Sequence, residues 1–300
     1  MTTAVLQRPG DRRIDRTAEM QAEDAAAMAA AVRGASSIFY WGMRLLPAPR
    51  RRAMYALWAF CHELDTIAAE PSPTRQRELL VGWRREIAEL FDGRPRRPHT
   101  RALAGAVKLC GLNRNDFMAI IEGKSLDAEI DMRAPSLIEL DVHCAQVSVA
   151  IGRLAIQIHG TPSLVGDRVA AEIGRALRLT CILHDLAADG ARQRLYLPRD
   201  VLRAHGIDDT DPATVLSHPA LPQVCDVLAR RAERHYADAA ALIASLPRHN
   251  LRGVLMVVVC YRALLDQLSA RGWTRLDQPV RVPAWRKIML LLRCGLFGRC

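Results

Sequence analysis

Two aspartates four residues apart, Asp185 and Asp189, are the side chains of this chain best suited to binding a divalent cation. On an α-helix, residues four apart lie on one face, which places the two carboxylates about 6 Å from each other. Mg²⁺ typically takes one or two protein carboxylates and completes its coordination with substrate phosphates. The same spacing also occurs on ordinary solvated helix surfaces, so the pair alone indicates a metal site only weakly.

The residues that precede these acids strengthen the metal interpretation. The stretch from Ile173 to Leu186 is mostly apolar, and the apolar run 53–61 likewise leads to an acid, Asp65. A helix that is apolar on every side is typical of a protein core. A carboxylate that continues such a helix destabilises the fold unless it is paired, protonated or bound to a metal ion. The two acidic helix ends are therefore candidates for a functional site.

The elements that must position these acids are predicted to be helices. Alanine-rich segments with charged residues three and four apart recur along the chain, and strict alternation of apolar and polar residues is almost absent. We expect helices over residues 17–34, 50–70, 75–92, 100–109, 114–130, 137–159, 164–190, 220–245 and 250–271. The segments between them, which are marked by proline and glycine, are too short to be interdomain linkers. The sequence predicts one all-α domain over 33–283, with a polar N-terminal extension (1–32) and a basic amphipathic C-terminal segment (284–300).

The charge balance favours an anionic partner. The chain has 42 lysines and arginines against 32 acidic residues, a net charge of +10, and nearly all of the positive charge is arginine. Arginine is suited to forked contacts with phosphate oxygens. A phosphorylated small molecule, an anionic membrane or a nucleic acid would fit this charge, and so would an ordinary solvated basic surface. Because no nucleic-acid-reading module is recognisable, we do not expect nucleic acid as a partner.

The cysteines and the apolar stretches bear on location. Eight cysteines are spread along the chain without a CxxC pair, which predicts reduced thiols in a cytoplasmic protein. The N-terminal residues are charged and lack the apolar region of a signal peptide. The longest apolar stretches, such as 253–260, fall short of the roughly 20 residues that a spanning helix needs. We therefore do not expect a single-pass membrane protein.

Two long segments resemble a known family. LRLTCILHDLAADGARQRLYLP (177–198) is similar to the second aspartate-rich signature of squalene and phytoene synthases. SSIFYWGMRLLP (36–47) and RRAMYALWAFCHELDTIAAE (51–70) resemble the leading segment and the first aspartate-rich motif of that family. The similarity extends in order over about residues 33–290 and is greatest to the bacterial members that make presqualene diphosphate for hopanoids.

The resemblance implies a fold, a reaction and a cofactor. It implies an all-α isoprenoid-synthase-type helical bundle around a central cavity, and a prenyltransferase that joins two farnesyl diphosphates head to head to give presqualene diphosphate. Mg²⁺ ions held between the aspartate-rich helices would bind the diphosphates and promote departure of one of them. Elementary physics agrees, because metal ions and arginines stabilise a leaving diphosphate and an apolar wall shelters an allylic cation.

The resemblance also assigns roles to individual residues. Asp65 corresponds to the first aspartate of the first motif, and Asp185 and Asp189 to the metal-binding pair of the second. Ser36 and Arg51 stand where the family contacts diphosphate, although Arg51 also fits a surface arginine cluster.

The end of the second motif supplies two further candidates. Arg194 and Tyr196 keep this part of the family pattern and are the catalytic candidates. A buried tyrosine is more often a packing residue than a proton donor. Asp127 matches an acidic position of the family's central helix.

Departures from the family pattern lower the expected metal content. Thr66 and Ala69 stand where the first motif has aspartates, and Ala188 replaces an acid of the second motif. Mg²⁺ affinity falls with ligand charge, so we expect a weak or absent metal site at the first motif and fewer ions than usual. Arg178, where the family has glutamine, is expected either to bind substrate phosphate in place of a metal or to form an ion pair with a carboxylate of a neighbouring helix.

These departures leave a second function open. The chain could have kept the fold and the lipid cavity but lost turnover, and would then act as a prenyl-lipid-binding or assembly protein. The C-terminal segment mixes apolar and basic residues, which is typical of a helix on an anionic membrane face or of a helix that caps the domain. If the C-terminal segment lies on a membrane, the protein is expected to attach peripherally to the inner face of the cell membrane.

Overall fold

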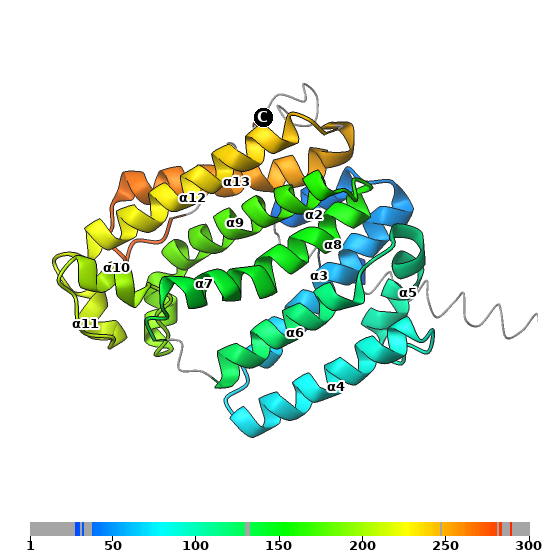
Figure 1. The fold of residues 1–300 in the computed structure, drawn as a ribbon, viewed down its shortest axis with the longest axis horizontal. Coiled ribbons are helices and arrows are strands. Elements are labelled where there is room, and N and C mark those ends of the chain that lie inside the picture. The colour runs from blue at the N-terminus through cyan, green and yellow to red at the C-terminus, as the bar shows by residue number, and fades with distance from the viewer. Residues whose placement is uncertain are drawn as a thin grey trace, which may run out of the picture.

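All regular structure in the described part of the chain is helical (Figure 1). The computed structural model describes residues 28–30, 32, 38–129, 133–246, 248–280, 282, 283 and 289. Within these ranges, the only β-type pairing is an isolated parallel bridge between Arg133 and Leu195. The predicted all-α class is confirmed. The two terminal segments, 1–32 and 284–300, lie almost wholly outside the described residues, so their boundaries stay predictions.

In chain order the helices are α2 (Ile38–Arg44), α3 (Ala48–Ala68), α4 (Pro73–Phe91), α5 (Pro98–Cys110), α6 (Arg114–Glu129), α7 (Leu137–Cys144), the π-helical segment η1 (Ala145–Val149), α8 (Ala150–His159), α9 (Leu164–Ala191), α10 (Arg199–Ala204), α11 (Pro212–Leu216), α12 (Leu221–Ile243) and α13 (Arg248–Arg271). The helices α3–α9, α12 and α13 follow the predicted ranges closely, whereas the short helices α2, α10 and α11 were not predicted. The predicted helix over 17–34 lies almost wholly outside the described residues.

Local sequence signals explain several of the helix ends. Ser163 caps α9, and its hydroxyl accepts a hydrogen bond from the amide of Gly166 at 2.9 Å. Ser136 and Glu139 form a reciprocal capping box at the start of α7. Gly111 and Gly160 end α5 and α8 with positive φ angles of 65° and 83°, a conformation that glycine adopts without strain.

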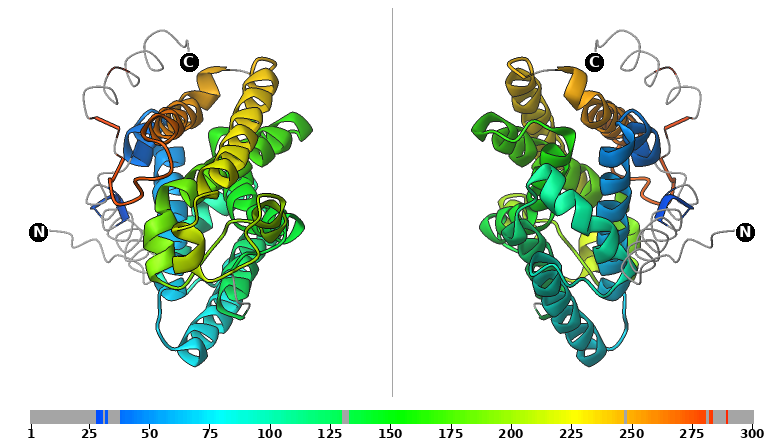
Figure 2. Two further views of the ribbon diagram at one scale, coloured as in Figure 1. Left: turned by 90° about the vertical axis from the view of Figure 1, so that its left-hand side faces the viewer. Right: turned by 90° about the vertical axis from the view of Figure 1, so that its right-hand side faces the viewer.

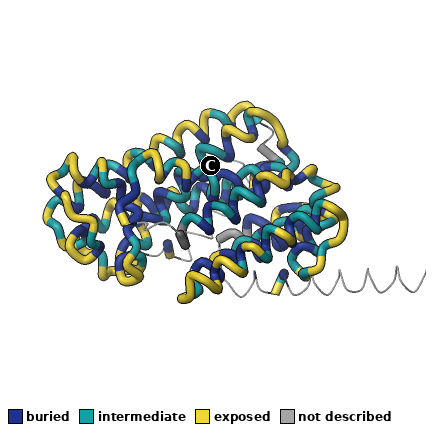
Figure 3. The backbone as a smooth tube through the Cα atoms, turned by 60° about the horizontal axis from the view of Figure 1, so that its bottom comes forward, coloured by how far each residue is buried: buried dark blue, intermediate teal, exposed yellow. Residues whose placement is uncertain are grey.

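Two hydrophobic clusters make up most of the core. One joins α3, α4, α5 and α6 to α8, and the other joins α9, α12 and α13 with the shorter helices α7, α10 and α11. Helix α8 contributes to both clusters and lies between them (Figure 1). Buried residues follow the inward faces of the helices and exposed residues their outer faces (Figure 3). The two clusters therefore form the two sides of the bundle.

Helix α9 has two apolar faces with different partners. One face packs along α12, where the Thr180 hydroxyl lies 3.0 Å from the Tyr236 hydroxyl in a fully buried pair. An adjoining face carries Ile173, Leu177 and Arg178, which line a cavity. Packing against α12 thus fixes the face that α9 presents to the cavity.

Close helix contacts at glycines place the π-helical segment η1. A Cβ added to Gly174 of α9 would meet the backbone of Ser148 at 2.8 Å, and one added to Gly123 of α6 would meet Val147 at 2.5 Å. Only glycine allows backbones to approach so closely. The segment η1 is therefore held between α6 and α9, with Val147 and Ser148 at the cavity.

Helix α13 corrects one expectation. Residues Asn250–Arg271 are long and apolar enough to cross a membrane by length and composition, whereas we expected no stretch to pass that test. Uninterrupted apolar runs are short here, but isolated polar residues in a long helix leave the average apolar. The helix packs against α2, α9 and α12 (Figure 2), and Leu251, Leu265 and Leu268 are fully buried. This packing accounts for its composition as that of a core helix.

Candidate functional site

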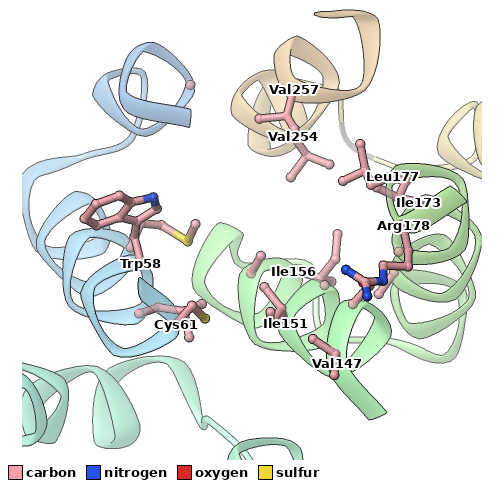
Figure 4. A pocket seen from close by; sticks show the side chains of 18 of the residues that line it. Trp58, Cys61, Val147, Ile151, Ile156, Ile173, Leu177, Arg178, Val254 and Val257 are labelled. Atoms are coloured by element: carbon pink, nitrogen blue, oxygen red, sulfur yellow. The ribbon is translucent and has the colours of Figure 1, made fainter. Parts of the chain in front are cut away.

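A cavity of about 360 Å³ lies among four helical walls (Figure 4). Trp58 and Cys61 of α3 face Leu177 and Arg178 of α9 across it. The other two walls are η1 with α8, and α13 with α2. Most of the lining is apolar, and its apolar members include Met54, Leu57, Ile151, Ile156, Ile173, Val254 and Val257. Such a lining suits a hydrocarbon chain.

The apolar end of the cavity is closed by a buried histidine. The Nδ1 atom of His159 lies 2.7 Å from the Asn250 carbonyl oxygen, and Arg50 donates a hydrogen bond of 2.8 Å to the His159 carbonyl. Burial lowers the pKa of His159, so the ring is neutral at physiological pH. Beside it, a Cβ added to Gly253 would meet the Gly42 carbonyl oxygen at 2.7 Å, so α2 and α13 meet there almost backbone to backbone.

The opposite end of the cavity carries charge. Asp65 of α3 and Lys124 of α6 both line it, and the Lys124 Nζ lies 2.7 Å from an Asp65 carboxylate oxygen. The lysine side chain is only 12% exposed, whereas the aspartate side chain is 60% exposed. The first aspartate-rich motif therefore presents an ion pair to the cavity.

Asp185 and Asp189 of α9 are not part of the cavity lining, but they follow Cys181, a lining residue, by about one and two turns. Asp185 accepts a contact of 2.6 Å from the Nδ1 atom of His184, which raises the pKa of that histidine. Burial and the neighbouring charge of Asp185 raise the pKa of Asp189, while Arg178 and Arg194 act in the opposite direction. A like-charged pair of this kind gains stability from a cation.

The pKa of the Cys181 thiol is influenced by acids of both motifs. Burial is the main cause that raises the pKa of Cys181 to about 11, and the charges of Asp185, Asp189 and Asp65 raise it further. Acids from α3 and α9 therefore act on the same sulfur atom at the cavity wall. The two acid-bearing helices face one cavity rather than separate regions.

Arg178 is held against an aromatic ring at this end. Its guanidinium carbon lies 4.7 Å from the centre of the Tyr196 ring, a cation–π contact, and that ring lies 5.8 Å from His143. Burial, Arg178 and Lys124 together lower the pKa of His143 to about 2, so this histidine is neutral. Tyr196 is 5% exposed and its ring contacts Arg178, while its catalytic role stays a prediction.

Of the remaining predicted site residues, one lies near the site, one does not line the cavity and two cannot be placed. Arg194 donates a hydrogen bond of 3.1 Å to the Ala68 carbonyl, which ties the chain after α9 to the end of α3. Arg51 is half-buried in the first turn of α3 and does not line the cavity. Ser36 lies outside the described residues, as does the side chain of Asp127 in α6. The structure thus brings together Asp65, Arg178, Arg194 and the two acids of α9.

The residues present fit a metal ion at one motif and not at the other. The α9 pair offers two carboxylates: Asp185, which is paired with the neighbouring His184, and the half-buried Asp189, whose pKa is raised by burial and by the like charge of Asp185. At the first motif, the exposed Asp65 carboxylate is already paired with Lys124, and no second acid lies one turn further, where the chain has Ala69. No cluster of three or more histidines, cysteines and acids occurs among the residues that the structure describes. A cation site of two carboxylates plus substrate phosphate is what this arrangement allows.

Sequence reasoning missed Lys124. It is one of three lysines in the 300 residues, and it follows a glycine in α6. Those two features set it apart, but its distance to Asp65 depends on how α3 and α6 pack. The signal in the sequence was therefore only that an unusual cation lay near Asp127.

The comparisons with known proteins point to one family. The sequence profile of the squalene/phytoene synthase family matches residues 32–286. Presqualene diphosphate synthase of Sinorhizobium fredii is 38% identical over 261 residues, which cover 87% of this chain and 93% of that protein. Its counterpart in Rhodopseudomonas palustris is 39% identical with the same coverage, and phytoene synthase of Thermus thermophilus is 29% identical over 268 residues, or 89% of this chain and 91% of that protein.

Solved structures show the same fold. A dehydrosqualene synthase in complex with a ligand superposes with a TM-score of 0.81 at 20% identity, covering 94% of this chain and 99% of that one. Squalene synthase HpnC from Alicyclobacillus acidocaldarius superposes with a TM-score of 0.77, also at 20% identity, covering 87% and 97%. The predicted isoprenoid-synthase-type bundle is confirmed.

Proposed function

The chain belongs to the squalene/phytoene synthase family, and from this premise we propose that it condenses two farnesyl diphosphates head to head to presqualene diphosphate. The observation that carries the proposal is the cavity, which is apolar along most of its length and charged at the end lined by Asp65, Lys124 and Arg178. The farnesyl chains would lie along the apolar walls, with their diphosphates at the charged end. Relatives that are 37–39% identical carry the name of this reaction's product.

The proposed reaction breaks a carbon–oxygen bond, a carbon–hydrogen bond and one π bond, and it forms the two carbon–carbon bonds that complete a cyclopropane. The allylic carbon–oxygen bond of one farnesyl diphosphate breaks, and its diphosphate leaves with the electron pair. The double bond of the second molecule attacks the resulting cation, and loss of a proton closes the cyclopropane. The second diphosphate remains on the product.

The residues of this chain support the departure of the diphosphate and the protection of the allylic cation. Arg178 and Lys124 lie where they would oppose the charge on a departing diphosphate, and such preorganised charge is a major source of rate enhancement. The walls contributed by Trp58, Ile151 and Val257 would keep water from the allylic cation. His143 remains uncharged beside them, so it adds no positive charge near that cation.

Members of this family generally use a divalent metal. We propose Mg²⁺ as that metal here, held by Asp185 and Asp189 together with substrate phosphate. When bound, it supplies charge neutralisation for the leaving diphosphate. The first motif would contribute no second ion, because Asp65 is paired with Lys124.

Purified protein incubated with farnesyl diphosphate and Mg²⁺, followed by extraction of the lipids, tests the function. Presqualene diphosphate in the extract is the expected result. Tight binding of farnesyl diphosphate without any product would overturn the enzyme proposal. That outcome would favour a prenyl-lipid-binding or assembly protein, the second candidate, which the loss of first-motif acids supports.

We also propose that the protein works in the cytoplasm, in peripheral contact with an anionic membrane. The C-terminal segment 284–300, rich in basic and apolar residues, lies outside the described residues except for Met289. The lipid product and the net charge of +10 support the proposal. Removal of 284–300 should reduce binding to anionic liposomes, and unchanged binding would rule the anchor out.

A further inference from the structure

The ion pair between Lys124 and Asp65 joins the neighbouring helices α6 and α3 at the charged end of the cavity. Gly123 lets α6 lie directly against η1, and the next residue, Lys124, lines the cavity between α6 and α3. The Nζ atom lies 2.7 Å from Asp65, and the side chain is 12% exposed. A lysine so far buried requires a partner, and Asp65 is the partner that the fold supplies.

This pair uses the carboxylate that a first-motif metal would need. A single carboxylate beside a positive ammonium group offers a divalent cation little attraction and a repelling charge. An ammonium group has three hydrogen-bond donors, so contact with one carboxylate oxygen leaves capacity for phosphate oxygens. Lys124 thus places one positive charge where the family places a metal.

A second cation meets it from the opposite wall. Arg178 projects from α9 towards the end of the cavity formed by η1 (Figure 4), and Tyr196 holds its guanidinium group in place. Lys124 and Arg178 both line this cavity, and both also lower the pKa of the same buried imidazole, His143. Two cations from α6 and α9 therefore converge on one region of the cavity.

We propose that Lys124 and Arg178 together bind one diphosphate group directly, in place of the metal ion of the first motif. This half of the site would then bind its ligand without any divalent cation, while the α9 pair keeps the metal. The identity of the natural ligand rests on the proposed function. Binding itself is separate from turnover and is tested separately.

Isothermal titration of the full-length protein with inorganic pyrophosphate in excess EDTA provides the test. We expect wild-type protein to bind pyrophosphate under these conditions and Lys124→Met to lose at least tenfold in affinity. Arg178→Gln should lose affinity similarly. Lys108→Met is the matched control, because Lys108 is exposed on α5 and remote from the cavity lining. Wild-type protein that fails to bind without metal, or a Lys124→Met variant that binds equally well, would overturn the proposal.

Asp65→Asn distinguishes the two kinds of site even if Lys124→Met folds poorly. At a metal site, loss of the carboxylate weakens diphosphate binding. At a lysine site, the variant keeps the ammonium group and removes a negative charge, so pyrophosphate affinity in EDTA should be equal or higher. Weaker binding by Asp65→Asn would contradict the proposal.

The outcomes also separate this proposal from the proposed function. Pyrophosphate binding in EDTA, with no presqualene diphosphate formed from farnesyl diphosphate and Mg²⁺, refutes the enzyme function alone. Product formation by a protein that binds pyrophosphate only with Mg²⁺ refutes the role of Lys124 alone.

Discussion

The carboxylate of Asp65 on α3 acts electrostatically on the thiol of Cys181 on α9, although the two helices form opposite walls of the cavity. Helix α9 carries Asp185 one turn beyond that thiol and Asp189 two turns beyond it, and both also act on it. The acids of the two motifs, which are far apart in the sequence, therefore influence the same region around the Cys181 thiol.

Replacing both acids of α9 should abolish catalysis while leaving the fold intact. We expect Asp185→Asn/Asp189→Asn to reduce kcat/KM at least about 10²-fold, because the pair neutralises a developing diphosphate charge through its metal. Titration with Mg²⁺ in the presence of pyrophosphate should show the loss of metal binding directly. Asp208→Asn, a change of an exposed loop aspartate, serves as the control. Wild-type turnover in the double variant would show that the metal binds elsewhere.

Filling the apolar end of the cavity should separate binding of the hydrocarbon chain from binding of the diphosphate. Ala155 of α8 lines the cavity and is half-buried. We expect Ala155→Phe to weaken farnesyl diphosphate binding at least tenfold, because the added ring occupies space that the chain needs. Pyrophosphate affinity, measured by the same titration, should not change.

Ala237→Phe, which places the same ring on an exposed position of α12, controls for the change in bulk. Equal farnesyl diphosphate affinity in Ala155→Phe and wild-type protein would mean that the chain lies outside this cavity.

The fold was more predictable than the site, for a physical reason. A periodic sequence pattern carries information about one helix at a time and none about its neighbours. The expected helix over 137–159 corresponds to α7, η1 and α8 in series. The π-helical turn within it was not predicted, because it depends on how closely Gly123 and Gly174 let the flanking helices approach. The short helices α10 and α11 have too few residues to produce a periodic pattern.

The site was predictable where one helix carries it and not where two helices must meet. Asp185, Asp189 and Arg178 lie on α9, and their relation follows from helical spacing. The pairing of Lys124 with Asp65 depends on the packing of α6 beside α3, which no local pattern records. A metal ligand was therefore predicted at Asp65, where the structure shows the partner of a lysine.

Glu86 should stabilise the fold at neutral pH but not in acid. Burial opposes ionisation of Glu86, but hydrogen bonds from Thr100 and from the amides of Arg97 and Arg96 outweigh it and lower the pKa. Because the pKa is lower in the folded state, the stabilisation is complete above the ordinary glutamate value and is lost as the pH falls through the folded value.

Denaturant unfolding of Glu86→Gln measures this contribution. We expect the variant to lose about 1–3 kcal/mol at pH 7, and the difference should shrink as the pH falls below about 4. Glu78→Gln, which removes an exposed pair with Arg75 at 3.5 Å, should change stability by less than about 0.5 kcal/mol. A pH-independent difference for Glu86→Gln would show that the ionised carboxylate is not the stabilising form.

Arg194 is best explained as a positioning residue that couples the two motifs. Its guanidinium group donates a hydrogen bond to the Ala68 carbonyl at the end of α3, and its charge lowers the pKa of Asp189 on α9. Arg194→Ala should therefore raise the pKa of Asp189 further and weaken the tie to α3. We expect kcat to fall about tenfold or more and the acid limb of the kcat profile to move to higher pH.

The conservative variant distinguishes charge from geometry at this position. Arg194→Lys keeps the charge near Asp189 but lacks the planar fork that reaches the Ala68 carbonyl. It should restore the pH profile towards that of wild-type protein while recovering only part of kcat, as followed by presqualene diphosphate formation across the pH range. If Arg194→Ala lowers kcat with an unshifted profile, its charge does not reach Asp189, and the residue acts only through its hydrogen bond to α3.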